Sequence, residues 1–226
     1  METELKLRFT HPDGPGRLLD DPWFHQLVMP DSSVDTDMFS RYFDTPDQIL
    51  TSRQTLLRIR KEGDRNTVTV KLGVKADNGL HQRLEWTVEL PDGDWPAEPE
   101  TGLDINWFQK YAVSDGDPDD QLRMILEMIE GRPLVEICQA RFIRKAYDVG
   151  FGSTLMELAL DQGEISAGSL ADAISELEVE LKEGDVRDLI ALGAELIRRY
   201  DLVPEPQSKY SRCLELLRQQ GGLHGI

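Results

Sequence analysis

The length, composition and charge of this chain narrow the functions it can have. It has 226 residues and a formal net charge of −17, from 42 acidic and 25 basic residues. This acidity argues against a general surface for nucleic acid or anionic membranes, because those partners need a basic footprint. A local cluster of Arg and Lys, acting together with cations, can still bind a small phosphate-bearing anion.

The sequence also predicts the setting of the protein. It contains no apolar run of about 18 residues, the length that a transmembrane helix needs. Its N-terminus lacks a basic region followed by an apolar stretch, so no signal peptide is expected. Cys138 and Cys213 have no metal-ligand spacing, and we expect both to be small core residues. These features predict a soluble protein in a reducing, cytoplasmic setting, with neither nucleic acid nor membrane as partner.

Alternation and helical periodicity predict the elements in chain order. Strands are expected at residues 2–9, 39–44, 56–61, 66–73, 81–90, 135–147, 154–161 and 176–182. Helices are expected at residues 15–28, 118–130, 185–200 and 208–219, with Asp185 as an N-cap. A segment at 91–117, rich in Pro, Gly and Asp, is interpreted as an insertion or linker. Many strands with few helices favour an α+β fold with an antiparallel sheet or barrel.

The first predicted strand carries a pattern that suggests chemistry. Successive side chains of a strand alternate between its faces, so Glu2, Glu4 and Lys6 share one face. Two carboxylates at this spacing can share a hard divalent cation. The adjacent lysine can hold an anion that the same cation binds.

Later strands repeat this charged face. Its members are Arg58 and Arg60; Thr67, Thr69 and Lys71; Arg83, Glu85, Thr87 and Glu89; and Glu176, Glu178, Glu180 and Lys182. For one strand alone, a solvated sheet face is the ordinary explanation. Recurrence of paired Arg and paired Glu favours a closed sheet with a polar interior, where buried charges are paired or bind ligands.

Together these motifs resemble the CYTH superfamily, the triphosphate tunnel metalloenzymes. The motifs are Glu2-x-Glu4-x-Lys6, Tyr42-Phe43-Asp44-Thr45, Leu57-Arg58-Ile59-Arg60, Thr69-x-Lys71, Arg83-x-Glu85, Leu160-Asp161-x-Gly163, Glu176-x-Glu178-x-Glu180 and Ser208-Lys209-Tyr210. The resemblance spans positions 2–210. It implies one tunnel domain over residues 1–226, with the insertion at about 91–117 and without the histidine-rich helical second domain of some relatives. The implied fold is an eight-stranded antiparallel β-barrel with helices outside.

The resemblance also implies a cofactor and residue roles. It implies dependence on Mg²⁺ or Mn²⁺ and a triphosphate-bearing substrate. The implied metal ligands are Glu2, Glu4, Asp161, Glu176 and Glu178, with Glu85 and Glu180 as further candidates. The implied triphosphate-binding residues are Lys6, Arg58, Arg60, Lys71, Arg83, Arg141, Arg144 and Lys209, of which Lys6, Arg58, Arg60 and Lys71 are the implied catalytic residues. Whether Arg141 or Arg144 faces the tunnel is left open.

Hydrolysis of inorganic triphosphate to diphosphate and phosphate is the leading hypothesis. Hydrolysis of thiamine triphosphate or a nucleoside triphosphate is an alternative, although Trp86 falls on the apolar face and offers no base-stacking surface. A class IV adenylate cyclase and a non-catalytic polyphosphate-binding protein are further alternatives. The sequence leaves open the preferred metal, the oligomeric state and the role of the 91–117 segment.

Overall fold

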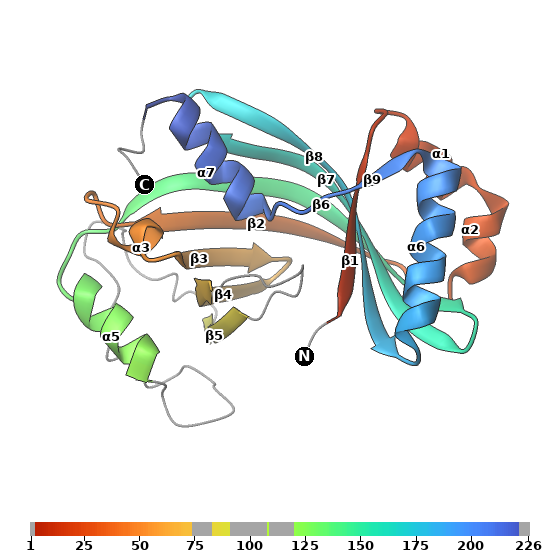
Figure 1. The fold of residues 1–226 in the computed structure, drawn as a ribbon, viewed down its shortest axis with the longest axis horizontal. Coiled ribbons are helices and arrows are strands. Elements are labelled where there is room, and N and C mark those ends of the chain that lie inside the picture. Colours follow the sequence, from red (N-terminus) through yellow and green to blue (C-terminus); the bar gives the residue numbers. More distant parts are fainter. Residues whose placement is uncertain (1–2, 74–82, 91–107, 109–119, 222–226) are drawn as a thin grey trace. The chain divides into compact units, whose positions relative to one another are not determined.

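The structure is a computed structural model that describes residues 3–73, 83–90, 108 and 120–221. Its strands are β1 (Glu4–Phe9), β2 (Val34–Asp44), β3 (Thr55–Glu62), β4 (Arg65–Gly73), β5 (Arg83–Leu90), β6 (Val135–Phe151), β7 (Thr154–Ala167), β8 (Leu170–Glu183) and β9 (Leu202–Pro204). The described helices are α1 (Gly14–Asp20), α2 (Pro22–Leu27), α3 (Ile49–Ser52), α5 (Asp120–Ile129), α6 (Val186–Tyr200) and α7 (Lys209–Gln219) (Figure 1).

The strands form one nine-stranded sheet in the order β5-β4-β3-β2-β6-β7-β8-β1-β9. Strand β1 pairs antiparallel with both β8 and β9. The successive pairs β2–β3, β3–β4 and β4–β5 are antiparallel as well. The predicted α+β class and antiparallel sheet are therefore confirmed. The expected eight-stranded closed barrel differs, because β9 adds a ninth strand and no ladder joins β5 to β9 in the described part of the chain. Three residues of β9 are too few to show alternation, and alternation cannot report whether a sheet closes.

The chain divides into two compact units. Unit 1 comprises Met1–Asp37, Arg141–Glu164 and Asp172–Ser208, and unit 2 comprises Met38–Ala140, Ile165–Ala171 and Lys209–Ile226. The one-domain organisation stays a prediction. The 91–117 segment lies outside the described residues except for Phe108, which is buried in the core of unit 2.

The core of unit 1 follows the sequence pattern. Leu7 of β1 and Leu177 and Val179 of β8 are fully buried, opposite the charged faces of the same strands. Helix α6 begins as predicted, because the side chain of Asp185 accepts a hydrogen bond from the N–H of Arg187 at 2.8 Å. Helices α1, α2 and α6 contact one another in this unit (Figure 1).

The helix expected at residues 15–28 is two helices instead. Asp21, between them, has an extended backbone with φ −78° and ψ 118°. Pro22 has no N–H to continue the α1 ladder and disfavours helical geometry at the residue before it. The Asp21 side chain then caps α2 by accepting from the N–H of Trp23 at 2.8 Å.

The core of unit 2 packs strands β3, β4 and β5 against α5. Val68, Val70 and Val88 supply buried side chains from the sheet, and Leu122 and Leu126 supply them from the helix. Trp86 is also buried here, at 4% exposure, as its place on the apolar face predicts.

Cys138 of β6 and Cys213 of α7 form a disulfide, with their Cα atoms 6.1 Å apart. Both residues are buried, as expected of core residues, but the sequence did not predict that they are bonded to each other. The two residues are 75 positions apart, so no local sequence pattern predicts their pairing. A disulfide is also unusual in a reducing compartment, so the cysteines no longer support that part of the predicted setting.

None of the described helices combines the length and apolar character that crossing a membrane requires.

Candidate active site

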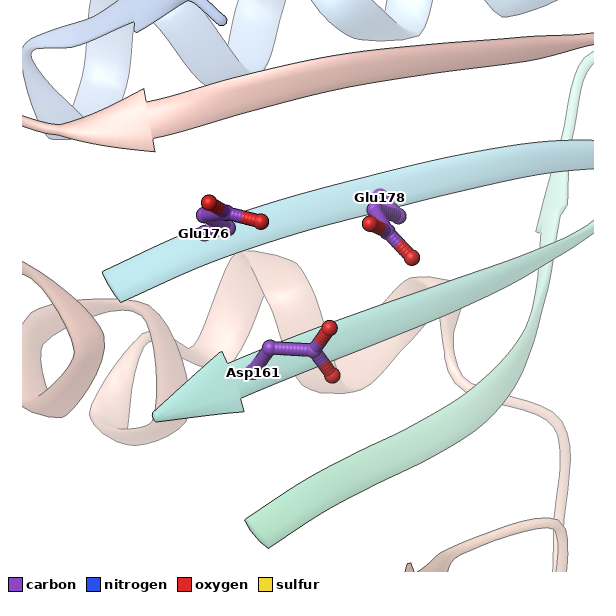
Figure 2. Close-up of side chains that lie close together, drawn as sticks. All are labelled: Asp161, Glu176 and Glu178. Atoms are coloured by element: carbon purple, nitrogen blue, oxygen red, sulfur yellow. The ribbon is translucent and has the colours of Figure 1, made fainter. Parts of the chain in front are cut away.

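Three carboxylates of unit 1 gather on neighbouring strands. Asp161 comes from β7, and Glu176 and Glu178 come from β8 (Figure 2). One oxygen from each lies within 4.8 Å of the others. Asp161 and Glu176 have no exposed surface, and the Glu178 side chain is 19% exposed. Buried carboxylates need compensating positive charge, so this cluster is a candidate cation site.

Arg144 supplies part of that charge from β6. Its guanidinium binds Asp161 in a bidentate pair, with both N–O distances 2.7 Å, and also donates to Glu178. Burial disfavours the Arg144 charge, but its hydrogen bonds and charge interactions with Asp161 and Glu178 prevail and raise its pKa. Arg141, by contrast, has an exposed side chain. Of these two candidates, the structure brings Arg144 to the carboxylates.

Strand β1 adds its charged face to the same cluster. In the β1–β8 ladder, Glu4 lies opposite Glu180 and Lys6 lies opposite Glu178, so these residues share one face of the sheet. The ammonium of Lys6 lies 2.9 Å from Glu176 and 3.9 Å from Glu178, and it donates to the carbonyl of Gln207 at 3.0 Å. The ammonium of Lys6 therefore lies beside the carboxylates of Glu176 and Glu178.

The remaining acidic candidates lie differently. Glu4 is exposed, whereas Glu180 accepts a hydrogen bond from Lys182 at 2.9 Å. The ammonium of Lys182 also lies 3.6 Å from the carboxylate of Glu157 in β7. Glu2 lies outside the described residues.

The donor set fits a hard divalent cation. All donors of the three-residue cluster are carboxylate oxygens, the ligands that Mg²⁺ and Mn²⁺ prefer. The charged groups of Arg144 and Lys6 lie against the same carboxylates. Asp161, Glu176 and Glu178 are thus the residues of this chain that would hold such an ion.

Unit 2 carries a basic face on β3 and β4. Arg58 and Arg60 are half-buried. Leu57 and Ile59, which alternate with them along β3, are buried on the opposite face. Arg60 donates to the hydroxyl of Ser40 at 3.0 Å. Arg58 donates to the hydroxyl of Thr69 at 3.4 Å, and that hydroxyl lies 3.1 Å from the hydroxyl of Thr87.

Two further candidates extend this face along β4 and β5. Lys71 is half-buried and lies opposite Glu85 in the β4–β5 ladder. The backbones of Arg83 and Glu85 belong to β5, but their side chains lie outside the described residues.

Helix α7 brings basic residues into unit 2. Lys209, its first residue, is buried at 8% exposure, as is Arg212 at 6%. Arg212 was not among the predicted site residues. The sequence feature that could have identified Arg212 is its spacing, because a residue three positions after Lys209 lies on the same helix face.

The Tyr42-Phe43-Asp44-Thr45 motif organises the turn beside α7. Asp44 has no exposed surface, and its carboxylate accepts hydrogen bonds from the N–H groups of Thr45, Leu50 and Thr51 at 2.7–2.9 Å. This side chain therefore fixes α3. Tyr210 of α7 lies with its hydroxyl 3.2 Å from that of Thr51.

The protein is similar to proteins of known family. Residues 1–214 match the CYTH domain family. An inorganic triphosphatase from Haemophilus influenzae is 32% identical over 173 residues, which are 76% of this chain and 43% of that protein. This chain thus spans less than half the length of that curated relative.

Solved structures share the fold. One is a putative adenylyl cyclase from Hippeastrum with a dominant triphosphatase activity, at 19% identity and TM-score 0.63, covering 99% of this chain and 98% of that one. Another is a putative adenylate cyclase from Bacillus halodurans, at 19% identity and TM-score 0.55, covering 92% of this chain and 94% of that one. At these identities the likeness concerns the fold. Because the CYTH match covers nearly the whole sequence, the chain belongs to the CYTH domain family.

Proposed function

We propose that this protein hydrolyses inorganic triphosphate to diphosphate and phosphate, with Mg²⁺ or Mn²⁺ as cofactor. The observation that carries the proposal is the buried cluster of Asp161, Glu176 and Glu178 with Arg144 and Lys6 bound to it. Three carboxylates would repel a bare polyanion, so they suit an anion that arrives with a cation. The Haemophilus influenzae relative, named an inorganic triphosphatase, supports the same activity.

In this proposal, the carboxylates of unit 1 bind the cation. Asp161, Glu176 and Glu178 are its ligands, with Glu4, Glu2 and Glu180 as further candidates. Such a cation would supply charge neutralisation for the triphosphate oxygens and would lower the pKa of a bound water. Arg144 holds Asp161 and Glu178 in place through its bidentate contact, as partners of metal ligands commonly do.

The basic side chains bind the triphosphate. Guanidinium groups present planar pairs of donors that match phosphate oxygens, which suits Arg58 and Arg60 to this role. The other proposed phosphate-binding residues are Lys6, Lys71, Arg83, Arg141 and Lys209. Phosphoryl transfer depends mainly on positioning and charge stabilisation, so fixed donors of this kind account for the catalytic effect.

The test is phosphate release from metal-stripped protein. Inorganic triphosphate, ATP and thiamine triphosphate are each supplied at equal concentration, with Mg²⁺, with Mn²⁺ and with EDTA. We expect fast release from inorganic triphosphate only when a divalent ion is present. Faster release from ATP or thiamine triphosphate would reassign the substrate, and release in EDTA would contradict the metal dependence. Tight triphosphate binding without release would favour a polyphosphate-binding protein.

A further inference from the structure

The start of helix α7 is attached to the rest of unit 2 at two neighbouring points. The ring of Tyr210 lies 5.3 Å from the ring of Tyr42, and its hydroxyl lies 3.2 Å from that of Thr51. One contact fixes the plane of the ring and the other fixes its outer end. Tyr210 directly follows Lys209, the buried lysine with which the helix begins.

The ring contact places this helix end on a defined face of the sheet. Tyr42 lies opposite Arg58 in the β2–β3 ladder, and Ser40 lies opposite Arg60. Residues opposite each other in a ladder share a face. The first turn of α7 therefore lies on the face of the sheet that carries Arg58 and Arg60.

The hydroxyl contact leads to a rigid base. The N–H of Thr51 donates to Asp44 at 2.8 Å, and the same carboxylate accepts from Leu50 and Thr45. Asp44 has no exposed surface, so water does not compete for these bonds. The hydrogen bond between the hydroxyls of Tyr210 and Thr51 thus attaches the start of α7 to a turn whose geometry Asp44 fixes.

Burial keeps the Tyr210 hydroxyl protonated. Burial raises its pKa to about 12, and the nearby Asp44 charge acts in the same direction, although the Thr51 hydrogen bond opposes them. The hydroxyl therefore remains a neutral hydrogen-bonding group throughout the neutral pH range.

We propose that Tyr210, held by Thr51, is a positioning residue that fixes Lys209 against the arginine-bearing face of β3. This proposal rests on the proposed function, in which Lys209 binds a phosphate of the substrate. A misplacement of about 1 Å in a charged donor is enough to weaken binding and catalysis. Tyr210 and Thr51 themselves need not touch the substrate.

The decisive variants are Tyr210→Phe and Thr51→Val, each of which removes one hydroxyl and keeps the side-chain shape. We expect each to raise the KM for inorganic triphosphate about three- to tenfold, as loss of one buried hydrogen bond implies, with a smaller change in kcat. The double variant should match either single variant, because both remove the same contact. In a Lys209→Ala background, Tyr210→Phe should leave KM unchanged.

Tyr200→Phe is the matched control. Tyr200 is a buried tyrosine of unit 1 whose hydroxyl donates to Asp21 at 2.8 Å. Its loss should lower thermal stability about as much as the loss of the Tyr210 hydroxyl, without changing KM. If Tyr210→Phe lowers stability and leaves KM at the wild-type value, its role is structural only and the proposal is overturned.

A second readout does not depend on hydrolysis. The rate at which an amine-specific acylating reagent modifies Lys209, followed by mass spectrometry, should rise several-fold in Tyr210→Phe and stay unchanged in Tyr200→Phe. Wild-type protein that releases no phosphate would refute the proposed function, and the labelling rates would still decide the positioning. Equal Lys209 labelling in wild type and Tyr210→Phe would overturn the positioning whatever the activity.

Discussion

The two units treat buried charge in different ways. In unit 1, Asp161 and Glu176 meet the charged groups of Arg144 and Lys6 at 2.7 and 2.9 Å. In unit 2, Arg60 donates to a serine hydroxyl, which shares a hydrogen bond but neutralises no charge. Unit 1 therefore pairs its buried carboxylates with cationic side chains, whereas Arg58 and Arg60 of unit 2 donate to neutral hydroxyls. In the proposed function, this difference assigns the cation to the carboxylates of unit 1, whereas the triphosphate is bound by basic residues of unit 2 together with Lys6 and Arg141 of unit 1.

Asp161→Asn should have the largest effect, because it removes one charge from the carboxylate cluster while keeping the size of the side chain. We expect activity to fall at least ~100-fold, beyond the 10–100-fold cost typical of residues that only support metal ligands. Divalent-metal binding, measured by calorimetry, should weaken in parallel.

Two companion variants make that result interpretable. Glu164→Gln removes an exposed charge from the same strand and should change neither activity nor metal binding. Glu4→Gln alters an exposed candidate ligand, so it should cut turnover without threatening the fold. If Asp161→Asn kept full activity and normal metal affinity, the assignment of the cation site to the carboxylates of unit 1 would be wrong.

Removal of the disulfide should affect unit 2 selectively. The double variant Cys138→Ser/Cys213→Ser lacks a cross-link across 75 residues, and losses of about 2–4 kcal/mol in unfolding free energy are typical. Hydrogen exchange should show the loss of protection first in α7 and β3 to β5, and later in α6. Uniform loss over both units would mean that they unfold together.

Gly163→Ala should destabilise unit 1 for a local steric reason. A Cβ there would lie 2.1 Å from the carbonyl oxygen of Arg141 and 2.5 Å from the Cα of Phe142, both backbone atoms that cannot move aside. We expect a loss of about 1–3 kcal/mol in a urea titration, as for other forced overpacking. Gly16→Ala, where a Cβ meets nothing within 4 Å, is the control and should unfold like wild type. Equal stability of both variants would show that β6 and β7 can separate at this point.

Arg60→Ala should have a smaller effect than Asp161→Asn and a more specific one. Loss of a charged donor to phosphate should raise the KM for inorganic triphosphate about tenfold or more and leave the metal requirement unchanged. Arg65→Ala removes the same charge from the same strand pair at an exposed ion pair with Glu89, and it should leave KM unaltered. A shift in metal affinity for Arg60→Ala would contradict the assignment of the cation to the carboxylates of unit 1.

Local patterns predicted most of the sheet. The alternation in 176–182 correctly placed Glu176 and Glu178 opposite Leu177 and Val179, because strand geometry fixes the side on which each residue falls. The Asp185 cap was equally local. The eight predicted strands are all present, although β2, β6, β7 and β8 extend well beyond their predicted bounds.

The features that the sequence left open or did not predict depend on residues that are distant in the sequence. Helix α3 depends on Asp44, which binds N–H groups up to seven residues later. The choice between Arg141 and Arg144 depends on carboxylates of β7 and β8, which no pattern within β6 reveals. Arg212 was not predicted, because the motif around Lys209 does not show which face of α7 is buried.

The bond between Cys138 and Cys213 also changes the connectivity of the molecule. The chain first leaves unit 2 after Ala140, re-enters it for Ile165–Ala171 and finally returns at Lys209, so the bond joins the strand of first departure to the helix of last return. Residues 139–212 thereby become a closed covalent ring that contains α6 and most of β6, as well as β7, β8 and β9. A single cut anywhere in that ring leaves one covalently continuous protein, and only reduction releases two pieces. A nicked form would then differ in mass from the intact protein only by the water added at the cut, and a thiol would be needed to separate it into two pieces.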